Sequence, residues 1–398
     1  MDNEYFKSKE FKEILKKYEE AESGKSVFLD AGDMTDVAEY FNIIGQSRKS
    51  LMIADEAVEN FPGAVKPLAF RARLALFLHD DIAEAKRYVD MIDDKSNLEY
   101  YYVEAEIMVA QNKVADANDY LAALIPTVDD EDLEDYYLDV ALLFADYNCL
   151  DVAEEWLKRS SYTDDLDYLD VESRIAYSRR ELGKCEKLYN KMLDEDAYNA
   201  HLWYQLANTE YGLGKLPDAL QSCDYALAIS PNDGETLLLR AIVLIELGNY
   251  DEATATLDKT DHLKADHAEA NVLRGRILLE KGDAAGAVER FRLALEESGH
   301  NFFTCLAVAV AFYEAGNYKE AYAMLKGLLD TPDGKAYNVG WAQLAVCVKE
   351  LGRGDDEFRH CVEEAVKTSP DETREVLKDY FPKGMDPNDY VAYLNFKH

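Results

Sequence analysis

Small residues recur along this chain at a fixed spacing. Four glycines stand 34 residues apart, and an alanine follows each of them five residues later. The glycines are Gly214, Gly248, Gly282 and Gly316. A period of this length indicates that one supersecondary unit is repeated in tandem. We therefore expect a stack of similar units rather than a globule built around a central pocket.

The apolar positions within one period predict two helices. In the period that starts at Ala200, Trp203, Leu206 and Ala207 fall on one face of a helix. Gly214 is suited to end that helix, and Pro217 is suited to the first turn of a second one. Small residues at two fixed places would let the two helices approach closely. Each period is therefore predicted to be an antiparallel helix pair.

This order of residues resembles the tetratricopeptide repeat, whose pattern of Trp, Leu, Gly or Ala, Tyr, then Ala, Phe and Pro it follows at the same intervals. The resemblance implies an all-α fold, an α-solenoid in the form of a right-handed superhelix of about ten antiparallel helix pairs. Five units follow the pattern closely and five more weakly. The strong units start at Ala200, Gly234, Ala268, Phe302 and Asn338, and the weak ones near Ala31, Lys66, Leu98, Glu134 and Leu169.

The ends of such a stack expose an apolar face and usually need an atypical cap. We expect an N-terminal capping helix in residues 1–30, the repeat array in 31–370 with its strongest part in 200–370, and C-terminal capping helices in 371–398. The apolar faces are formed by Phe11, Ile14, Leu15 and Tyr18, and by Val376, Leu377, Tyr380 and Phe381. A dimer contact is the alternative role for either terminal segment.

The chain is strongly acidic. Its 398 residues include 79 acidic and 43 basic side chains, which gives a formal net charge of -36. Such a field repels the phosphates of nucleic acid and the anionic face of a membrane, so we expect neither as a partner. Sixteen acidic residues against two basic ones lie between Asp129 and Glu172. Two explanations remain open, a well-solvated surface and attraction to a basic partner.

The remaining sequence features favour a cytoplasmic protein. The chain opens acidic and polar instead of with the pattern of a signal peptide. The longest apolar run, Phe302 to Phe312, is far shorter than the roughly 20 residues of a membrane helix and predicts a buried helix. The six cysteines have no paired spacing, which fits a reducing compartment.

No arrangement of side chains predicts catalysis. Residues 23–26 look like the end of a phosphate-binding loop, but the earlier glycine is missing. His262, Asp266 and His267 make only a weak metal site, and a solvated helix start explains them better. Cys223 lies at a packing position, where a small buried hydrophobe is expected. We expect no enzyme activity, catalytic residue, cofactor or metal.

In the family that this chain resembles, the first helices of successive units line a concave surface through positions 2, 5, 9 and 12. These positions form one helical stripe. The predicted partner-binding residues on it are Phe70, Phe77, Tyr102, Tyr177, Arg180, His201, Tyr204, Asn208, Tyr211, Arg276 and Tyr313. Apolar residues on the same stripe are Leu74, Leu138, Leu142, Leu238, Ile242, Phe303 and Val310. The alternative is that the aromatic residues mainly pack on neighbouring first helices.

These observations lead to one main functional hypothesis. We expect a non-enzymatic scaffold that binds a protein or peptide in the concave groove, as a monomer or weak homo-oligomer. Aromatic positions beside carboxylates suit a segment with apolar and basic residues. A structural protein that self-associates, or an accessory subunit of an enzyme complex, is the alternative.

Overall fold

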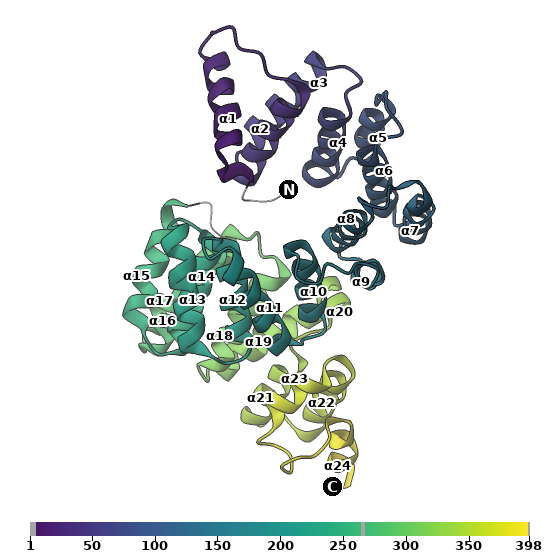
Figure 1. Ribbon diagram of the computed structural model, residues 1–398. Coiled ribbons are helices and arrows are strands. Elements are labelled where there is room, and N and C mark those ends of the chain that lie inside the picture. The colour runs from purple at the N-terminus through teal and green to yellow at the C-terminus, as the bar shows by residue number, and fades with distance from the viewer. Residues whose placement is uncertain (1–4, 264–266, 397–398) are drawn as a thin grey trace. The chain divides into compact units, whose positions relative to one another are not determined.

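The computed structural model describes residues 5–263 and 267–396, and in these residues it contains 24 α-helices and no strand (Figure 1). The chain divides into two compact units, Met1–Leu188 and Tyr189–His398. Within the described residues, α2 to α22 form ten successive helix pairs, and α20 is an additional short helix. The predicted all-α solenoid of about ten tetratricopeptide-type helix pairs is confirmed.

The first unit begins with a 3-10 turn, Tyr5–Lys7, and α1 (Lys9–Glu22). The helix pairs follow, and a second 3-10 turn, Ile125–Thr127, comes after α7. The pairs are α2 (Ala31–Ile43) with α3 (Ser47–Asn60), α4 (Val65–His79) with α5 (Ile82–Asp90), α6 (Leu98–Ala110) with α7 (Val114–Ala122), α8 (Leu133–Asp146) with α9 (Leu150–Leu157), and α10 (Leu166–Ser178) with α11 (Leu182–Glu195), which continues into the second unit.

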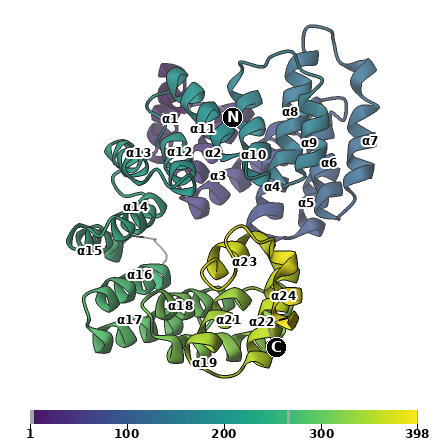
Figure 2. The same cartoon turned by 90° about the horizontal axis from the view of Figure 1, so that it is seen from below.

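The second unit continues the same plan, and Figure 2 shows its helices α16, α18 and α21 side by side. Its pairs are α12 (Ala200–Gly212) with α13 (Leu216–Ile229), α14 (Gly234–Glu246) with α15 (Tyr250–Asp258), α16 (His267–Glu280) with α17 (Ala284–Glu297), α18 (Phe302–Glu314) with α19 (Tyr318–Leu329), and α21 (Trp341–Glu350) with α22 (Asp355–Thr368). The other elements are the 3-10 turns Lys259–His262 and Pro387–Asp389 and the helices α20 (Pro332–Tyr337), α23 (Pro370–Leu377) and α24 (Tyr390–Phe396).

Every first helix begins within three residues of the start that the sequence predicts. The periodic glycines end these helices, because Gly214, Gly248, Gly282 and Gly316 all adopt positive φ, between 72° and 80°. Gly45 does the same in the unit that begins at Ala31, and in the other four weaker units residues other than glycine take this left-handed conformation. These are Asp80, Asn112, Asn148 and Arg180, with φ between 50° and 61°.

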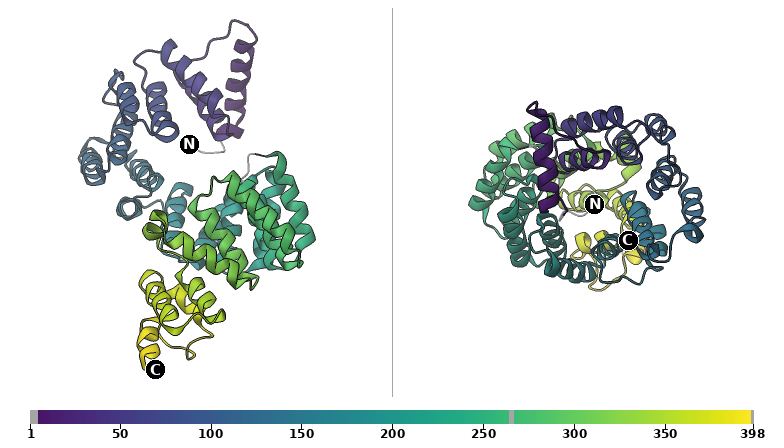
Figure 3. Two further views of the ribbon diagram at one scale, coloured as in Figure 1. Left: turned by 180° about the vertical axis from the view of Figure 1, so that it is seen from behind. Right: turned by 45° about the horizontal axis from the view of Figure 1, so that its top comes forward.

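The small residues of the repeat lie where the two helices of a pair meet. The side chains of Ala207, Ala241 and Ala309 on first helices and of Ala219 and Ala253 on second helices are fully buried. Larger apolar side chains fill the spaces between successive pairs, as the repeat pattern predicts. The successive pairs can be followed from behind in Figure 3, from purple through blue to teal in the first unit and from teal to yellow in the second.

Both terminal segments contribute to a core. Phe11, Ile14 and Tyr18 of α1 belong to the same cluster as Val37 and Phe41 of α2. At the other end, residues that follow α22, among them Leu377, Phe381 and Tyr390, join the cluster of α18 to α22. The role of these segments as caps stays a prediction. Within the described residues, no helix has the length and apolar character that crossing a membrane requires.

Candidate functional site

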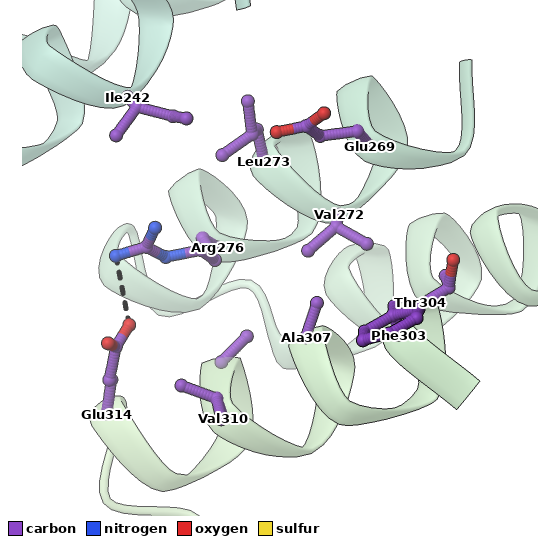
Figure 4. Close-up of a pocket in the computed structure, with 11 residues that line it drawn as sticks. Ile242, Glu269, Val272, Leu273, Arg276, Phe303, Thr304, Ala307, Val310 and Glu314 are labelled. Carbon is purple, nitrogen blue, oxygen red and sulfur yellow. Dashed lines mark ion pairs between the residues drawn. The ribbon is translucent and has the colours of Figure 1, made fainter. Parts of the chain in front are cut away.

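First helices of the second unit enclose a recess with a volume of about 340 Å³ (Figure 4). It lies on the side of α14, α16 and α18 that carries the predicted groove positions. Its apolar lining consists of Ile242, Val272, Leu273, Phe303, Ala307, Val310 and Ala311, and its polar lining of Glu269, Arg276, Thr304 and Glu314. We call this cavity the inner recess.

The sequence of α18 explains why the inner recess is apolar. Eleven residues from Phe302 to Phe312 include only one hydroxyl, and a helix of this composition presents apolar atoms all round. Val308, Ala309 and Phe312 are buried in the core. Phe303 and Val310 line the recess instead, and the Phe303 side chain is 59% exposed. The run thus forms a helix that is buried on one side only.

Charged residues close one end of the inner recess. Arg276 Nη2 lies 2.9 Å from Glu314 Oε2 of α18, as Figure 4 shows. The same nitrogen lies 3.1 Å from Glu246 Oε1 of α14. Burial raises the pKa of Glu314, Arg276 opposes that rise, and the charges of Glu246 and Glu280 add to it. The Tyr250 hydroxyl donates to Glu280 at 3.4 Å. One arginine therefore pairs with two carboxylates, and a third carboxylate, Glu280, lies near enough to act on Glu314.

The three carboxylates occupy equivalent places in successive repeats. Glu246, Glu280 and Glu314 are the last residues of α14, α16 and α18. Glu350 ends α21 in the same way and accepts a hydrogen bond from the Tyr380 hydroxyl at 2.6 Å. We call Glu246, Glu280 and Glu314 the carboxylate row. A negative charge at a helix C-terminus is unfavourable, because the helix dipole is negative there.

An exposed aromatic pair borders the inner recess. The Phe303 ring lies 4.9 Å from the ring of Tyr337, whose side chain is 50% exposed. Tyr337 ends the additional helix α20, and its ring also lies 5.0 Å from that of Phe302. Large exposed apolar side chains that gather beside a cavity are typical of interaction sites.

The structure brings two of the predicted groove residues in the second unit to the same carboxylates. Arg276 contacts Glu246 and Glu314 directly. Burial raises the pKa of Tyr211 on α12, with further contributions from Glu246 and Glu314, so Tyr211 lies at the same end. Tyr313 is half-buried and packs against the core, 6.2 Å from the ring of Tyr318.

The other predicted residues of α12 lie nearer its N-terminal end. His201 is exposed, and its ring lies 6.4 Å from that of Tyr204. Tyr204 and Asn208 are half-buried. Tyr204 packs against the cluster that α12, α13 and α14 share. None of these three residues lines the inner recess.

In the first unit the structure differs from the expected aromatic groove. Only 8% of the Phe70 side chain and 8% of the Tyr102 side chain are exposed, so both pack on neighbouring helices. Phe77 and Tyr177 are 59% and 47% exposed, and the Phe77 ring lies 5.5 Å from Tyr147. Arg180 lies in the turn after α10. The repeat formed by α10 and α11 starts at Leu166, three residues before the predicted start at Leu169. Counting from Leu169 wrongly placed Arg180 at position 12 of the groove stripe.

Charged pairs that the sequence analysis missed connect the first helices of this unit. Arg73 of α4 pairs with Glu106 and Glu99 of α6. Arg174 of α10 pairs with Asp146 of α8 at 2.7 Å. These pairs could have been found by counting each repeat from the observed helix starts, Val65 and Leu166. Both arginines then fall at position 9 of their repeats, which is one of the predicted groove positions.

Several carboxyl groups of the first unit are costly to ionise. Burial, followed by the charge of Asp36, raises the pKa of Glu39 to about 7. Partial loss of hydration, followed by the charge of Asp165, raises the pKa of Asp167 to about 6. Partial loss of hydration also raises the pKa of Asp139, which accepts a hydrogen bond from the Tyr102 hydroxyl at 2.9 Å.

The described residues contain no group of three His, Cys, Asp or Glu side chains that could hold a metal ion. His262 ends a 3-10 turn and His267 begins α16, while Asp266 lies outside the described residues. Burial raises the pKa of the Cys223 thiol to about 12, so this buried cysteine is a poor nucleophile at neutral pH.

Comparison with known proteins identifies the repeat. Residues 210–277 match the family model described as tetratricopeptide repeat. Tetratricopeptide repeat protein 8 of Caenorhabditis elegans is 21% identical over 252 residues, which are 62% of this chain and 49% of that protein. A crystal structure of a tetratricopeptide repeat protein from Parabacteroides merdae superposes with a TM-score of 0.52 at 18% identity, and covers 62% of this chain and 97% of that one. Residues 210–277 are therefore tetratricopeptide repeats, and the chain shares the fold of such proteins.

A second curated relative is the BBSome complex member BBS4 of Bos taurus, which is 27% identical over 125 residues, 31% of this chain and 24% of that protein. The chain thus spans about half or less of the length of the curated relatives that it matches. The likeness to solved structures shows the fold of the chain.

Proposed function

We propose that this tetratricopeptide repeat protein is a non-enzymatic scaffold that holds a protein partner on the first helices of its second unit, in the inner recess. The observation that carries the proposal is the recess itself, an apolar cavity lined by three successive first helices. Concave apolar cavities with a few polar groups are the usual places for binding. The bound segment has apolar and basic residues.

Apolar contact supplies the affinity in this proposal. Phe303, Val310 and Ile242 present apolar surface that a partner side chain would cover. Fully burying one large apolar side chain contributes about 1.5–3 kcal/mol. A few such anchors generally dominate the energy of a protein interface. The excess of carboxylates at the Arg276 end favours basic residues beside the anchor.

We propose a reducing, cytoplasmic setting and a monomer or weak homo-oligomer as the working form. All six cysteines are free, and four of them are buried. Free thiols are the usual state in reducing compartments. Light scattering across a range of protein concentrations measures the oligomeric state.

Filling the inner recess tests the proposed function. Val310→Trp places an indole in the recess without changing charge, and Val288→Trp is the matched control, because Val288 is exposed on the second helix α17. Partners captured from extracts of the native cells should be lost with Val310→Trp and retained with Val288→Trp. Capture of the same partners by both variants, each with wild-type circular dichroism, would show that the recess does not bind them.

A further inference from the structure

The end of the inner recess at Arg276 is more negative than one arginine can balance. Glu246 and Glu314 both lie within 3.1 Å of the same guanidinium nitrogen, so their carboxylate oxygens are within about 6 Å of each other. Glu280, the third member of the carboxylate row, acts on Glu314 as a further negative charge. The formal charge of this group is one positive against three negative.

Stability alone does not favour this arrangement. Each glutamate of the carboxylate row ends a helix, where the dipole disfavours a negative charge. The Glu246 and Glu314 side chains are 40% and 45% exposed, so they remain accessible beside the cavity. A group of unfavourable charges next to an apolar cavity is suited to a ligand that brings the opposite charge.

We propose that the carboxylate row is a cation subsite of the inner recess, which takes a lysine or arginine of the partner segment next to its apolar anchor, and that Arg276 is an internal competitor for this subsite. The inference rests on the proposed function, because it assigns one part of the same bound segment. It names the chemistry of the partner as an apolar side chain followed closely by a basic one.

The geometry of the recess places the two parts of the ligand. Figure 4 shows Val272, Ala307 and Val310 between two polar ends, one at Glu269 and Thr304 and the other at Arg276 and Glu314. The apolar anchor lies on the strip between these ends. The basic side chain then points toward the C-terminal ends of α14, α16 and α18, where the carboxylate row lies.

An acidic partner fits this site poorly. Arg276 is the one cation among the residues that line the inner recess, its side chain is only 22% exposed, and two carboxylates already bind its Nη2. A third carboxylate at this place would meet the repulsion of the carboxylate row. Replacing Arg276 with a neutral residue should therefore tighten the binding of a basic partner and weaken the binding of an acidic one.

Peptide selection provides a defined probe. A phage library of random dodecapeptides is selected on the wild-type protein and counter-selected on Val310→Trp. The expected peptides combine a large apolar residue with lysine or arginine within a few positions. Enrichment of acidic peptides, or of apolar peptides without basic residues, overturns the cation subsite.

The strongest peptide is then synthesised with a fluorescent label, and its affinity is measured by anisotropy. Glu280→Gln and Glu314→Gln should each weaken binding about 1.4- to fivefold, the range of a partly exposed ion pair. Arg276→Gln should tighten binding by a similar factor, because it removes the competing cation. Weaker binding to Arg276→Gln overturns the proposal.

The outer face offers a matched control. Arg292 of α17 lies between Glu289 and Glu296 of the same helix, much as Arg276 lies between Glu246 and Glu314. Arg292→Gln changes the net charge by the same amount and should leave the peptide affinity unchanged. Equal effects of Arg276→Gln and Arg292→Gln would show that only the overall charge matters, which also overturns the subsite.

Failure of this inference and failure of the proposed function give different results. If Val310→Trp abolishes capture of the native partner but the glutamine variants bind as wild type, the recess is a binding site and the cation subsite is wrong. If Val310→Trp captures the same partners as wild type, the proposed function itself is wrong.

Discussion

Gly275 allows α16 to pack closely against α17, because it has no side chain where the two helices meet. A Cβ atom at this position would lie 2.3 Å from the Phe291 ring. Gly275→Ala should therefore destabilise the protein by about 1–3 kcal/mol, the usual cost of overpacking a core. Thermal unfolding followed by circular dichroism measures the effect.

Two further variants make this prediction specific. Gly327 lies in α19 and has open space around it, so Gly327→Ala should be neutral or slightly stabilising. Adding Phe291→Leu to Gly275→Ala should recover part of the lost stability, because a smaller side chain makes room for the methyl group. A Gly275→Ala variant as stable as Gly327→Ala contradicts the close approach.

Glu39 gives the first unit a pH-dependent stability. Its pKa is about 7 in the folded chain against an ordinary value of 4.5, because the half-buried side chain loses hydration and lies near Asp36 and Glu99, with Arg73 opposing them. The folded state therefore keeps this proton to a higher pH than the unfolded state. The resulting stabilisation is complete below pH 4.5 and is lost as the pH rises through about 7.

Replacing Glu39 with the neutral glutamine removes this loss. At pH 8 Glu39→Gln should be more stable than the wild type by about 1–3 kcal/mol, and the difference should shrink at pH 5. Urea unfolding at the two pH values measures it. Glu59→Gln, which changes an exposed glutamate of α3, serves as the control and should show no such pH-dependent gain.

Single residues also show where sequence reasoning reaches its limit. The frame of the strong repeats placed Ile242, Arg276, Phe303 and Val310 on the stripe that lines the inner recess. In the weak repeat of α10 and α11 the predicted frame was wrong, because Leu166 and Leu169 are both apolar and either one can begin the pattern. Burial of Phe70 and Tyr102 depends on which helices pack above them, which no local pattern specifies.

At the scale of elements, the helix α20 is the main departure from the repeat. The spacing from Gly316 to Gly352 is 36 residues instead of 34, and α20 forms between α19 and α21. The sequence features that start and end α20 lie within the helix and at its two ends. Pro332 lies in its first turn, the Thr331 hydroxyl accepts from the Gly334 amide at 3.0 Å, and Asn338 ends it with a left-handed conformation. The 34-residue period alone predicts no helix at this place.

Removing the cap of α20 tests its stability as an element. Thr331→Ala should cost the helix about 1 kcal/mol and speed amide hydrogen exchange in residues 332–337, with little change in the overall melting temperature. The Tyr337 ring should lose its fixed place beside Phe303. Unchanged exchange in this segment would show that packing, not the cap, holds the helix.

At the scale of the whole molecule, the charge of -36 should act on the rate and strength of binding. A partner with basic residues should bind more weakly as salt rises, because the Debye length falls from about 10 Å at 0.1 M to about 3 Å at 1 M. Surface plasmon resonance with the selected peptide separates the two rates, and association should slow more than dissociation speeds up. An affinity that does not change with salt contradicts electrostatic steering.

The placement of the carboxylate row also has a genetic consequence. Since each glutamate ends a first helix, one repeat carries both a slice of the recess and one member of the row. A tandem duplication of the 34 codons from Ala268 to Asn301 would insert another helix pair in register, as solenoids allow. The site would then gain one apolar segment and one carboxylate of the row in a single step. The length and the charge of the site would therefore change together.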